Sequence, residues 1–186
     1  MAKTGLVVSA HPGDFVWRAG GAIALHAKKG YRVKIVCLAF GERGESQFAW
    51  KVPGMTLEKV KAGRRDEAER AAAALGAEIE FFDAGDYPLH LTPAHMERLI
   101  DIYREINPSF VLTHSLEDPY NVDHPAASAL SRPVRCTRPP GSRCCWQSRC
   151  TGAPTCGTST RRPMRSERSP ARLCVRRRGR LKPDRF

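Results

Sequence analysis

The sequence lacks any apolar run that approaches the roughly 18 residues of a membrane-spanning helix. It also lacks the apolar core of a signal peptide, because only about seven apolar or small residues come before His11 and Asp14. We therefore expect a cytoplasmic protein without a membrane partner. The 186 residues suffice for one domain with a sizeable core.

Cysteine is scarce before Leu130 and lysine is scarce after it, so the sequence has two parts of different composition. Residues 1–130 hold one cysteine, Cys37, together with 15 Lys/Arg and 17 Asp/Glu. Residues 131–186 hold six cysteines and 15 arginines, but only one lysine and two acidic residues. The net charge of +12 therefore describes neither part. We expect one folded domain over 1–130 and a separate, disordered basic tail over 131–186.

The tail lacks both helical and strand periodicity, and it contains no Cys-x-x-Cys pair. Three interpretations of it remain open. We favour a frameshift, because a GC-rich gene read out of frame gives Arg, Pro, Ser, Cys and Gly with almost no Lys. The others are an arginine-rich arm that binds nucleic acid, and a disulfide or zinc module. Under the favoured interpretation, nucleic acid is not a partner.

The first part of the chain alternates strand-like and helix-like segments. In chain order we expect strand 5–10, helix 17–29, strand 32–40, helix 57–75, strand 78–82, helix 93–106 and strand 109–114. On the first helix we expect Trp17 and Ile23 to be buried, and Gly30 to end it in the left-handed conformation. This order predicts an α/β fold with a Rossmann-like parallel sheet and helices on both faces.

Polar side chains follow the first and fourth predicted strands. "SAHPGDF" places His11 and Asp14 after the first, and "DPYNVDHPAAS" places His124 after the fourth. If these strands are neighbours, the loops meet at the carboxyl edge, where such sheets bind ligands. Two imidazoles and a carboxylate form a common catalytic zinc set, so we expect one divalent cation there, with His114 and Asp118 behind its ligands. A plainer interpretation is that Asp14 only caps a helix.

Four motifs, "SAHPGDF", "GERGES", "RRDEAERAAAALGA" and "DPYNVDHPAAS", resemble the PIG-L / LmbE-like family of zinc-dependent de-N-acetylases, over about residues 4–130. In that family a histidine and the second aspartate of an A-H-P-D-D-E motif bind zinc, and the first aspartate is the general base. The last histidine of a later H-P-D-H motif is the third ligand. The resemblance implies an LmbE-like fold and a Zn2+ ion held by His11, Asp14 and His124.

Two acid/base groups of this family are missing. Gly13 stands where the general base is expected, and Asn121 stands where a histidine stabilises the oxyanion. Amide hydrolysis needs a base and an electrophilic stabiliser, each worth orders of magnitude in rate. The chain resembles a hydratase branch of the family, which adds water to an unsaturated keto or enol polycarboxylate in the 4,5-cleavage catabolism of gallate and protocatechuate. This implies a small-molecule polycarboxylate substrate.

A hydratase needs a group that moves protons besides a Lewis acid. "GERGES" follows the second strand at the same edge of the sheet and offers Glu45, and in second place Glu42, for this role. Arg43 is the candidate to bind a substrate carboxylate, and Asn121 is a second substrate-binding candidate. Each loop carboxylate is also compatible with a solvated surface position.

Family members continue beyond the H-P-D-H region with further strands and helices, and often with an oligomer contact. Here the resemblance stops near Leu130, so we expect a fold that is incomplete at its C-terminal end. Such a loss of apolar contact can exceed the net stability of a domain, about 5–15 kcal/mol, and inactivate the enzyme. Two other functions stay open: a zinc-dependent de-N-acetylase or hydrolase, which Gly13 argues against, and nucleic-acid binding through the tail.

Overall fold

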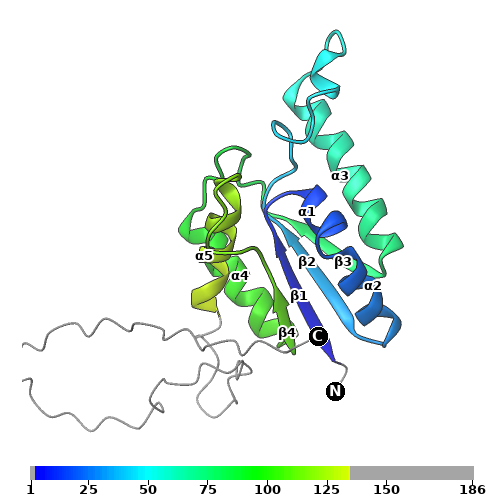
Figure 1. Cartoon of the computed structure of the whole chain (residues 1–186), viewed down its shortest axis with the longest axis vertical. Helices are drawn as coiled ribbons and strands as arrows, with labels where there is room; N and C mark the ends of the chain where they lie inside the picture. The colour runs from blue at the N-terminus through cyan, green and yellow to red at the C-terminus, as the bar shows by residue number, and fades with distance from the viewer. Residues whose placement is uncertain (1–2, 135–186) are drawn as a thin grey trace, which may run out of the picture. The chain divides into compact units, whose positions relative to one another are not determined.

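A four-stranded parallel sheet organises residues 3–134, the part of the chain that the computed structural model describes (Figure 1). Its strands are β1 (Thr4–Ser9), β2 (Arg32–Cys37), β3 (Ala77–Phe81) and β4 (Phe110–Leu112), in the spatial order β3-β2-β1-β4. Strand β1 is central and pairs in parallel with both β2 and β4. Because helices cover both faces of β1, five of its six residues are buried.

Five helices cover the sheet in two layers. They are α1 (Pro12–Trp17), α2 (Gly20–Lys28), α3 (Leu57–Ala74), α4 (Pro93–Ile106) and α5 (Asp123–Val134), with a 3-10 turn η1 (Ala49–Lys51) before α3. Figure 1 shows α1, α2 and α3 on one side of the sheet and α4 and α5 on the other. Successive residues of β1 point to opposite faces, so Val7 joins the first layer's core, and Leu6 and Val8 join the second's. The predicted α/β architecture is confirmed.

Capping residues, proline and glycine place several helix ends where the sequence predicts them. Helix α4 begins at Pro93, after Thr92 caps it by accepting the His95 N–H. Gly30 and Gly76 follow α2 and α3 at φ values of 80° and 74°, the left-handed region that glycine adopts at little cost.

The expected helix over 17–29 is wrong in two respects. It is two helices, α1 and α2, and Trp17 is exposed over 88% of its surface instead of buried. The break falls at Arg18 and Ala19, next to Gly20 and Gly21, whose low helix propensity weakens the helix at this point. Helix α1 begins already at Pro12, and this register buries Phe15 and turns Trp17 outward. Ile23 is buried, as predicted.

Two strands end earlier than expected, at Cys37 and Leu112, so the residues that follow them form loops at the carboxyl edge. Helix α5 reaches Val134, beyond the boundary expected at residue 130. Apart from residues 131–134, which belong to α5, the predicted tail lies outside the described residues, and so do its three interpretations. Within 3–134, no helix has the length and apolar character to cross a membrane.

Candidate metal centre

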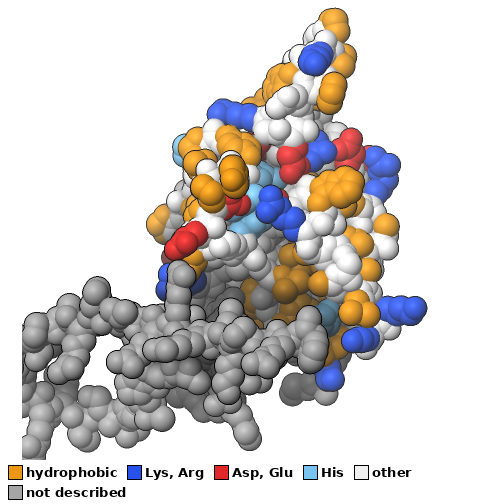
Figure 2. All heavy atoms as spheres, viewed as in Figure 1, with side chains coloured by type: hydrophobic (Ala, Val, Ile, Leu, Met, Phe, Trp, Pro, Cys, Tyr) orange, Lys and Arg blue, Asp and Glu red, His pale blue; other side chains and the backbone are white. Residues whose placement is uncertain are grey.

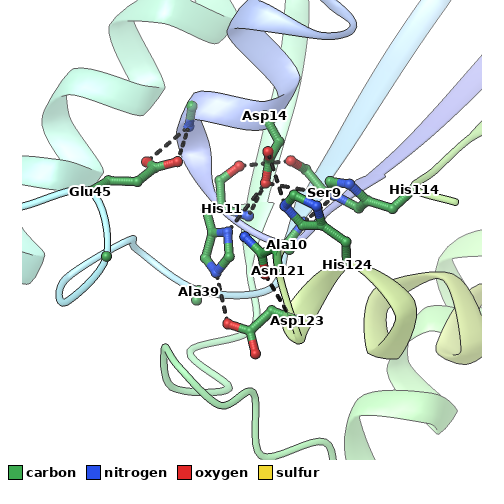
Figure 3. Close-up of polar contacts among 12 residues, drawn as sticks. Ser9, Ala10, His11, Asp14, Ala39, Glu45, His114, Asn121, Asp123 and His124 are labelled. Atoms are coloured by element: carbon green, nitrogen blue, oxygen red, sulfur yellow. Dashed lines mark hydrogen bonds and ion pairs between the residues drawn. The ribbon is translucent and has the colours of Figure 1, made fainter. Parts of the chain in front are cut away.

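His11, Asp14 and His124 point toward one another at the carboxyl ends of β1 and β4 (Figure 3). All three side chains are buried, and their donor atoms lie within 4.8 Å of one another. Asp14 is central, because Oδ2 lies 3.2 Å from His11 Nδ1 and Oδ1 lies 3.2 Å from His124 Nε2. Two ligand atoms that each lie about 2.0–2.1 Å from a tetrahedral zinc ion are about 3.3 Å apart. The three side chains are therefore spaced to hold one small cation.

Asp14 also contributes to the start of α1, so the plainer interpretation of this residue is not exclusive. His11 is the N-cap, and Asp14 Oδ2 accepts the His11 backbone N–H at 3.1 Å. Oδ1 faces the other way, toward His124 and the Nε of Arg18 at 3.2 Å. One carboxylate can therefore fix the helix end and offer an oxygen to a ligand.

A carboxylate on the far side of each imidazole fixes the orientation of the ring. His124 Nδ1–H donates to Asp118 Oδ2 at 2.7 Å, and His11 Nε2–H donates to Asp123 Oδ2 at 2.9 Å. With this proton placed, the lone pair of His124 Nε2 faces Asp14, whereas His11 Nδ1 donates to Asp14 Oδ2 at 3.2 Å and would bind a metal after losing its proton. This carboxylate–imidazole arrangement is typical of metal-binding histidines. Asp118 lies where it was expected, whereas Asp123 was missed, although it adjoins His124 in the motif.

Asp86 is a further buried carboxylate that sequence reasoning missed. Its Oδ1 lies 3.0 Å from His11 Nε2, and its Oδ2 accepts the backbone N–H groups of Arg43 at 2.6 Å and Gly44 at 2.9 Å. The side chain thus joins the loop after β2 to a candidate metal ligand. The loop before α4 has no apolar periodicity, and no motif pointed to it.

The buried charges at this site favour a divalent cation. Burial lowers the pKa of His11, but the carboxylates of Asp14, Asp86 and Asp123 outweigh burial and raise it to about 10. Burial would raise the pKa of Asp14 and Asp86, yet hydrogen bonding to His11 holds both below the ordinary value. One imidazolium cannot balance three buried carboxylates, and uncompensated buried charge is costly.

Two buried atoms at the site lack a hydrogen-bond partner among the described residues, His124 Nε2 and Asp86 Oδ1. His124 Nε2 is close to Asp14 but makes no hydrogen bond with it, and a buried acceptor left unpaired costs about 1–3 kcal/mol. A cation between these two side chains would satisfy the nitrogen. The site therefore fits a metal ion: it offers nitrogen and oxygen donors, an unpaired lone pair on His124 Nε2, and net negative charge.

His114 supports the site without being one of the three ligands. Its Nε2 accepts the Ala10 backbone N–H at 2.9 Å, and its ring stacks on His124 at 4.1 Å. Burial lowers the pKa of His114 to about 4, so the ring is neutral at pH 7. The 3.7 Å approach of His114 to Asp14 is therefore not an ion pair.

Glu45 fills the space that Gly13 leaves open (Figure 3). Both of its carboxylate oxygens accept the Gly13 backbone N–H, at 3.1 and 3.0 Å. A Cβ added at Gly13 would lie 2.5 Å from Glu45 Oε1, and one at Gly41 would lie 2.8 Å from Oε2. Arg64 Nη2 holds the same carboxylate at 2.5 Å. A loop carboxylate thus stands where the family's aspartate is missing.

The other two charged candidates of this loop do not join the ligands. Glu42 is buried, accepts the Phe40 N–H at 3.1 Å and lies 3.7 Å from Lys61 Nζ. Arg43 is exposed, and its guanidinium forms no ion pair with any side chain of the described part. Glu42 therefore supports the loop, and Arg43 is free to meet a solute.

Asn121 turns its amide toward Tyr87, a residue that sequence reasoning also missed. Asn121 Nδ2 donates to Tyr87 Oη at 2.6 Å, and Asn121 Oδ1 accepts the Asp123 N–H at 2.9 Å. The Tyr87 ring lies parallel to that of His11, with 5.3 Å between centroids. Burial and the nearby Asp86 and Asp123 carboxylates raise the pKa of Tyr87, so the phenol keeps its proton.

Two cavities give access to the site, and Asp14 and Arg18 line both. One, of about 330 Å³, reaches His114, and the other, of about 530 Å³, reaches Glu45 and Arg64. On the face shown in Figure 2, histidine, acidic and basic side chains gather between the α3 and α5 sides of the molecule. A small anionic molecule would meet both a base and cationic groups here.

Comparisons with known proteins agree with this geometry. The model of the GlcNAc-PI de-N-acetylase (PIG-L) family matches residues 6–134. A 4-oxalmesaconate hydratase of Pseudomonas putida is 59% identical over 133 residues, 72% of this chain and 52% of that protein. The crystal structure of GalB, the 4-carboxy-2-hydroxymuconate hydratase of Pseudomonas putida, gives a TM-score of 0.70 at 58% identity, over 72% of this chain and 56% of that one.

A deacetylase shares the fold at lower identity. The N,N'-diacetylchitobiose deacetylase of Pyrococcus horikoshii gives a TM-score of 0.64 at 27% identity, over 73% of this chain and 50% of that one. The chain thus spans about half the length of these relatives.

Proposed function

Because the chain belongs to the GlcNAc-PI de-N-acetylase (PIG-L) family, we propose that its site performs the hydratase variant of the family's metal chemistry. The reaction is the addition of water to the double bond of an unsaturated keto or enol polycarboxylate, such as 4-oxalmesaconate or 4-carboxy-2-hydroxymuconate. The observation that carries this proposal is Asn121, which takes the place of the deacetylases' oxyanion-stabilising histidine while Glu45 fills the space beside Gly13. The names of two relatives that are 58–59% identical support it.

We propose that His11, Asp14 and His124 hold one Zn2+ ion, which a mixed nitrogen and oxygen set suits. When bound, the cation supplies a Lewis acid that polarises a substrate oxygen and a water. Asp118 and Asp123 keep the two imidazoles in the tautomers that leave a lone pair for the ligand.

Glu45 takes a proton from the water whose hydroxyl adds to one carbon of the double bond, and returns that proton to the other carbon. Arg64 and the Gly13 N–H hold the carboxylate still, so little reorganisation is needed when it accepts a proton. Arg18, beside Asp14, and the exposed Arg43 offer guanidinium groups to the carboxylates of the substrate. Glu42 acts only on the conformation of the loop, through Phe40 and Lys61.

The test is hydration of 4-oxalmesaconate by the full chain loaded with Zn2+, followed by the loss of conjugated absorbance. We expect Glu45→Gln to lower kcat by about 10²–10⁴-fold, the usual contribution of a general base. Glu67→Gln is the matched control, because Glu67 pairs with the same Arg64 but is 56% exposed on α3. Equal activity of Glu45→Gln and the wild type would contradict the role of Glu45, and no hydration by the wild type would contradict the function.

The second candidate is a de-N-acetylase, which the position of Glu45 favours because a carboxylate stands in the place of the missing base. The same three residues would then hold the metal, and Glu45 would activate a water that attacks the amide carbonyl. Release of acetate from N,N'-diacetylchitobiose by the zinc-loaded chain would support this function. Hydration of 4-oxalmesaconate without any release of acetate would exclude it.

A further inference from the structure

We propose that the Tyr87 hydroxyl donates the hydrogen bond that stabilises negative charge developing on the substrate's keto or enol oxygen, an inference that rests on the proposed function. In the deacetylases the resemblance assigns oxyanion stabilisation to a histidine, and Asn121 replaces that histidine here. Asn121 is the positioning residue, and Tyr87 is the group that touches the substrate.

The Asn121 amide is engaged within the protein. Its oxygen accepts the Asp123 backbone N–H at 2.9 Å, and its nitrogen donates to Tyr87 Oη at 2.6 Å. Asp123 in turn fixes His11 and accepts the Tyr87 backbone N–H at 3.0 Å. The amide therefore connects the phenol to the residues that orient a metal ligand.

The phenol hydrogen is available to a ligand. Because Tyr87 Oη accepts from Asn121, its own hydrogen must point elsewhere, and within residues 3–134 no acceptor for it is found. The ring is stacked against His11, and the residue is 39% exposed, so solutes can reach it. A donor beside the candidate metal centre is where a developing oxyanion needs one.

The backbone of Tyr87 is strained in the position that places its ring against His11. Its φ of 44° lies in the left-handed region, which is strained for a bulky residue and is found mainly at functional sites. Gly44 makes room for the ring, because a Cβ at that position would collide with Tyr87 Cε2. A ring that only covered His11 would need neither the hydroxyl nor its contact with Asn121.

The test compares Tyr87→Phe with the wild type as full, zinc-loaded chains. One measurement is kcat and KM for hydration of 4-oxalmesaconate. The other is the affinity for 2-oxoadipate, which has a ketone and two carboxylates but no double bond to hydrate. Tyr120→Phe is the matched control, because Tyr120 lies near Asn121 in sequence and is 94% exposed. Zinc content and melting temperature show whether each variant keeps the fold and the metal.

We expect Tyr87→Phe to lower kcat by about a hundredfold with little change in KM, and to weaken 2-oxoadipate binding by about tenfold, with zinc content unchanged. We expect Asn121→Ala to lower kcat in the wild type but to add nothing to Tyr87→Phe, because it acts through the phenol. Tyr120→Phe should change neither measurement.

Hydration that Tyr87→Phe leaves unchanged would overturn this inference and leave the proposed function standing. A wild type that does not hydrate 4-oxalmesaconate, but binds 2-oxoadipate in a Tyr87-dependent way, would overturn the function and leave only the hydrogen bond from Tyr87 to a bound keto oxygen. A wild type that does neither would overturn both. Additive losses from Asn121→Ala and Tyr87→Phe would overturn the positioning role of Asn121.

Discussion

Gly13 gives the site room for a carboxylate that comes from another loop. Its backbone N–H binds Glu45, and its missing side chain leaves the volume that the carboxylate fills. Gly41 leaves room on the other side of the Glu45 carboxylate, and Arg64 forms an ion pair with it. The position of this base therefore depends on several neighbours, whereas the position of an aspartate at residue 13 would depend mainly on its own backbone.

Gly13→Ala tests this arrangement. The added Cβ meets only the flexible end of Glu45, and alanine suits a helix better than glycine, so the free energy of unfolding should not fall. Hydratase activity should fall at least about tenfold, because the carboxylate is displaced. Urea unfolding and the absorbance assay measure the two effects. Gly63→Ala on α3, with open space around it, is the control that should keep full activity. Full activity in Gly13→Ala would show that the position of Glu45 is unimportant.

Asp118→Asn tests the carboxylate behind His124. Replacing the acceptor at 2.7 Å by an amide weakens the control of the tautomer, and such changes usually cost about 10–100-fold in metal affinity. Competition with a chromophoric chelator measures the dissociation constant for Zn2+. Glu117→Gln, the exposed neighbour, should bind zinc like the wild type. An unchanged constant in Asp118→Asn would show that the charge of Asp118 does not support zinc binding through His124.

At the scale of elements, periodicity predicted the order of strands and helices well. The α4 bounds and the glycines after α2 and α3 were predictable, because Pro93, Gly30 and Gly76 act locally. The split between α1 and α2 was missed, because apolar spacing continues across the break at Arg18 and Ala19. The three metal-ligand candidates were predictable because they stand in two recognisable motifs. Asp86 and Tyr87 lie in a loop without periodicity, and only the fold brings them next to His11.

Glu80 on the edge strand β3 forms ion pairs with the neighbouring strand β2 and with helix α4. It pairs with Lys34 of β2 and Arg98 of α4, each at 2.7 Å. Burial would raise its pKa, but these two cations hold it below the ordinary 4.5. A carboxyl with a depressed pKa stabilises the fold above its unfolded pKa, and this contribution is lost as pH falls through the folded pKa.

We therefore expect Glu80→Gln to destabilise the protein at about pH 7 by roughly 1 kcal/mol or less, and to reduce the further loss of stability below pH 4.5. Urea unfolding at both ends of this range provides the measurement. Glu69→Gln, an exposed carboxylate of α3, should follow the wild type at every pH. An identical acid dependence in Glu80→Gln and the wild type would show that the pairs contribute nothing.

At the scale of the whole molecule, the candidate metal centre connects the two helix layers. His11 follows the central strand and Asp14 belongs to α1, whereas His124 belongs to α5 across the sheet. A cation shared by these three residues would join the layers at one point. It would also neutralise buried carboxylates that otherwise repel each other.

Removal of metal should therefore lower the melting temperature of the whole domain. Zn2+ at a thousand times its dissociation constant stabilises by about 4 kcal/mol, which scanning calorimetry with and without a chelator detects. Without metal, the carboxylates raise the pKa of His11 to about 10, so binding through Nδ1 must release a proton at neutral pH. The shift in melting temperature should then grow as pH rises from about 6 to 8. His124→Ala should abolish the shift, whereas His90→Ala, an exposed histidine, should keep it. A shift that persists in His124→Ala, or that is independent of pH, would mean that the stabilising cation binds elsewhere.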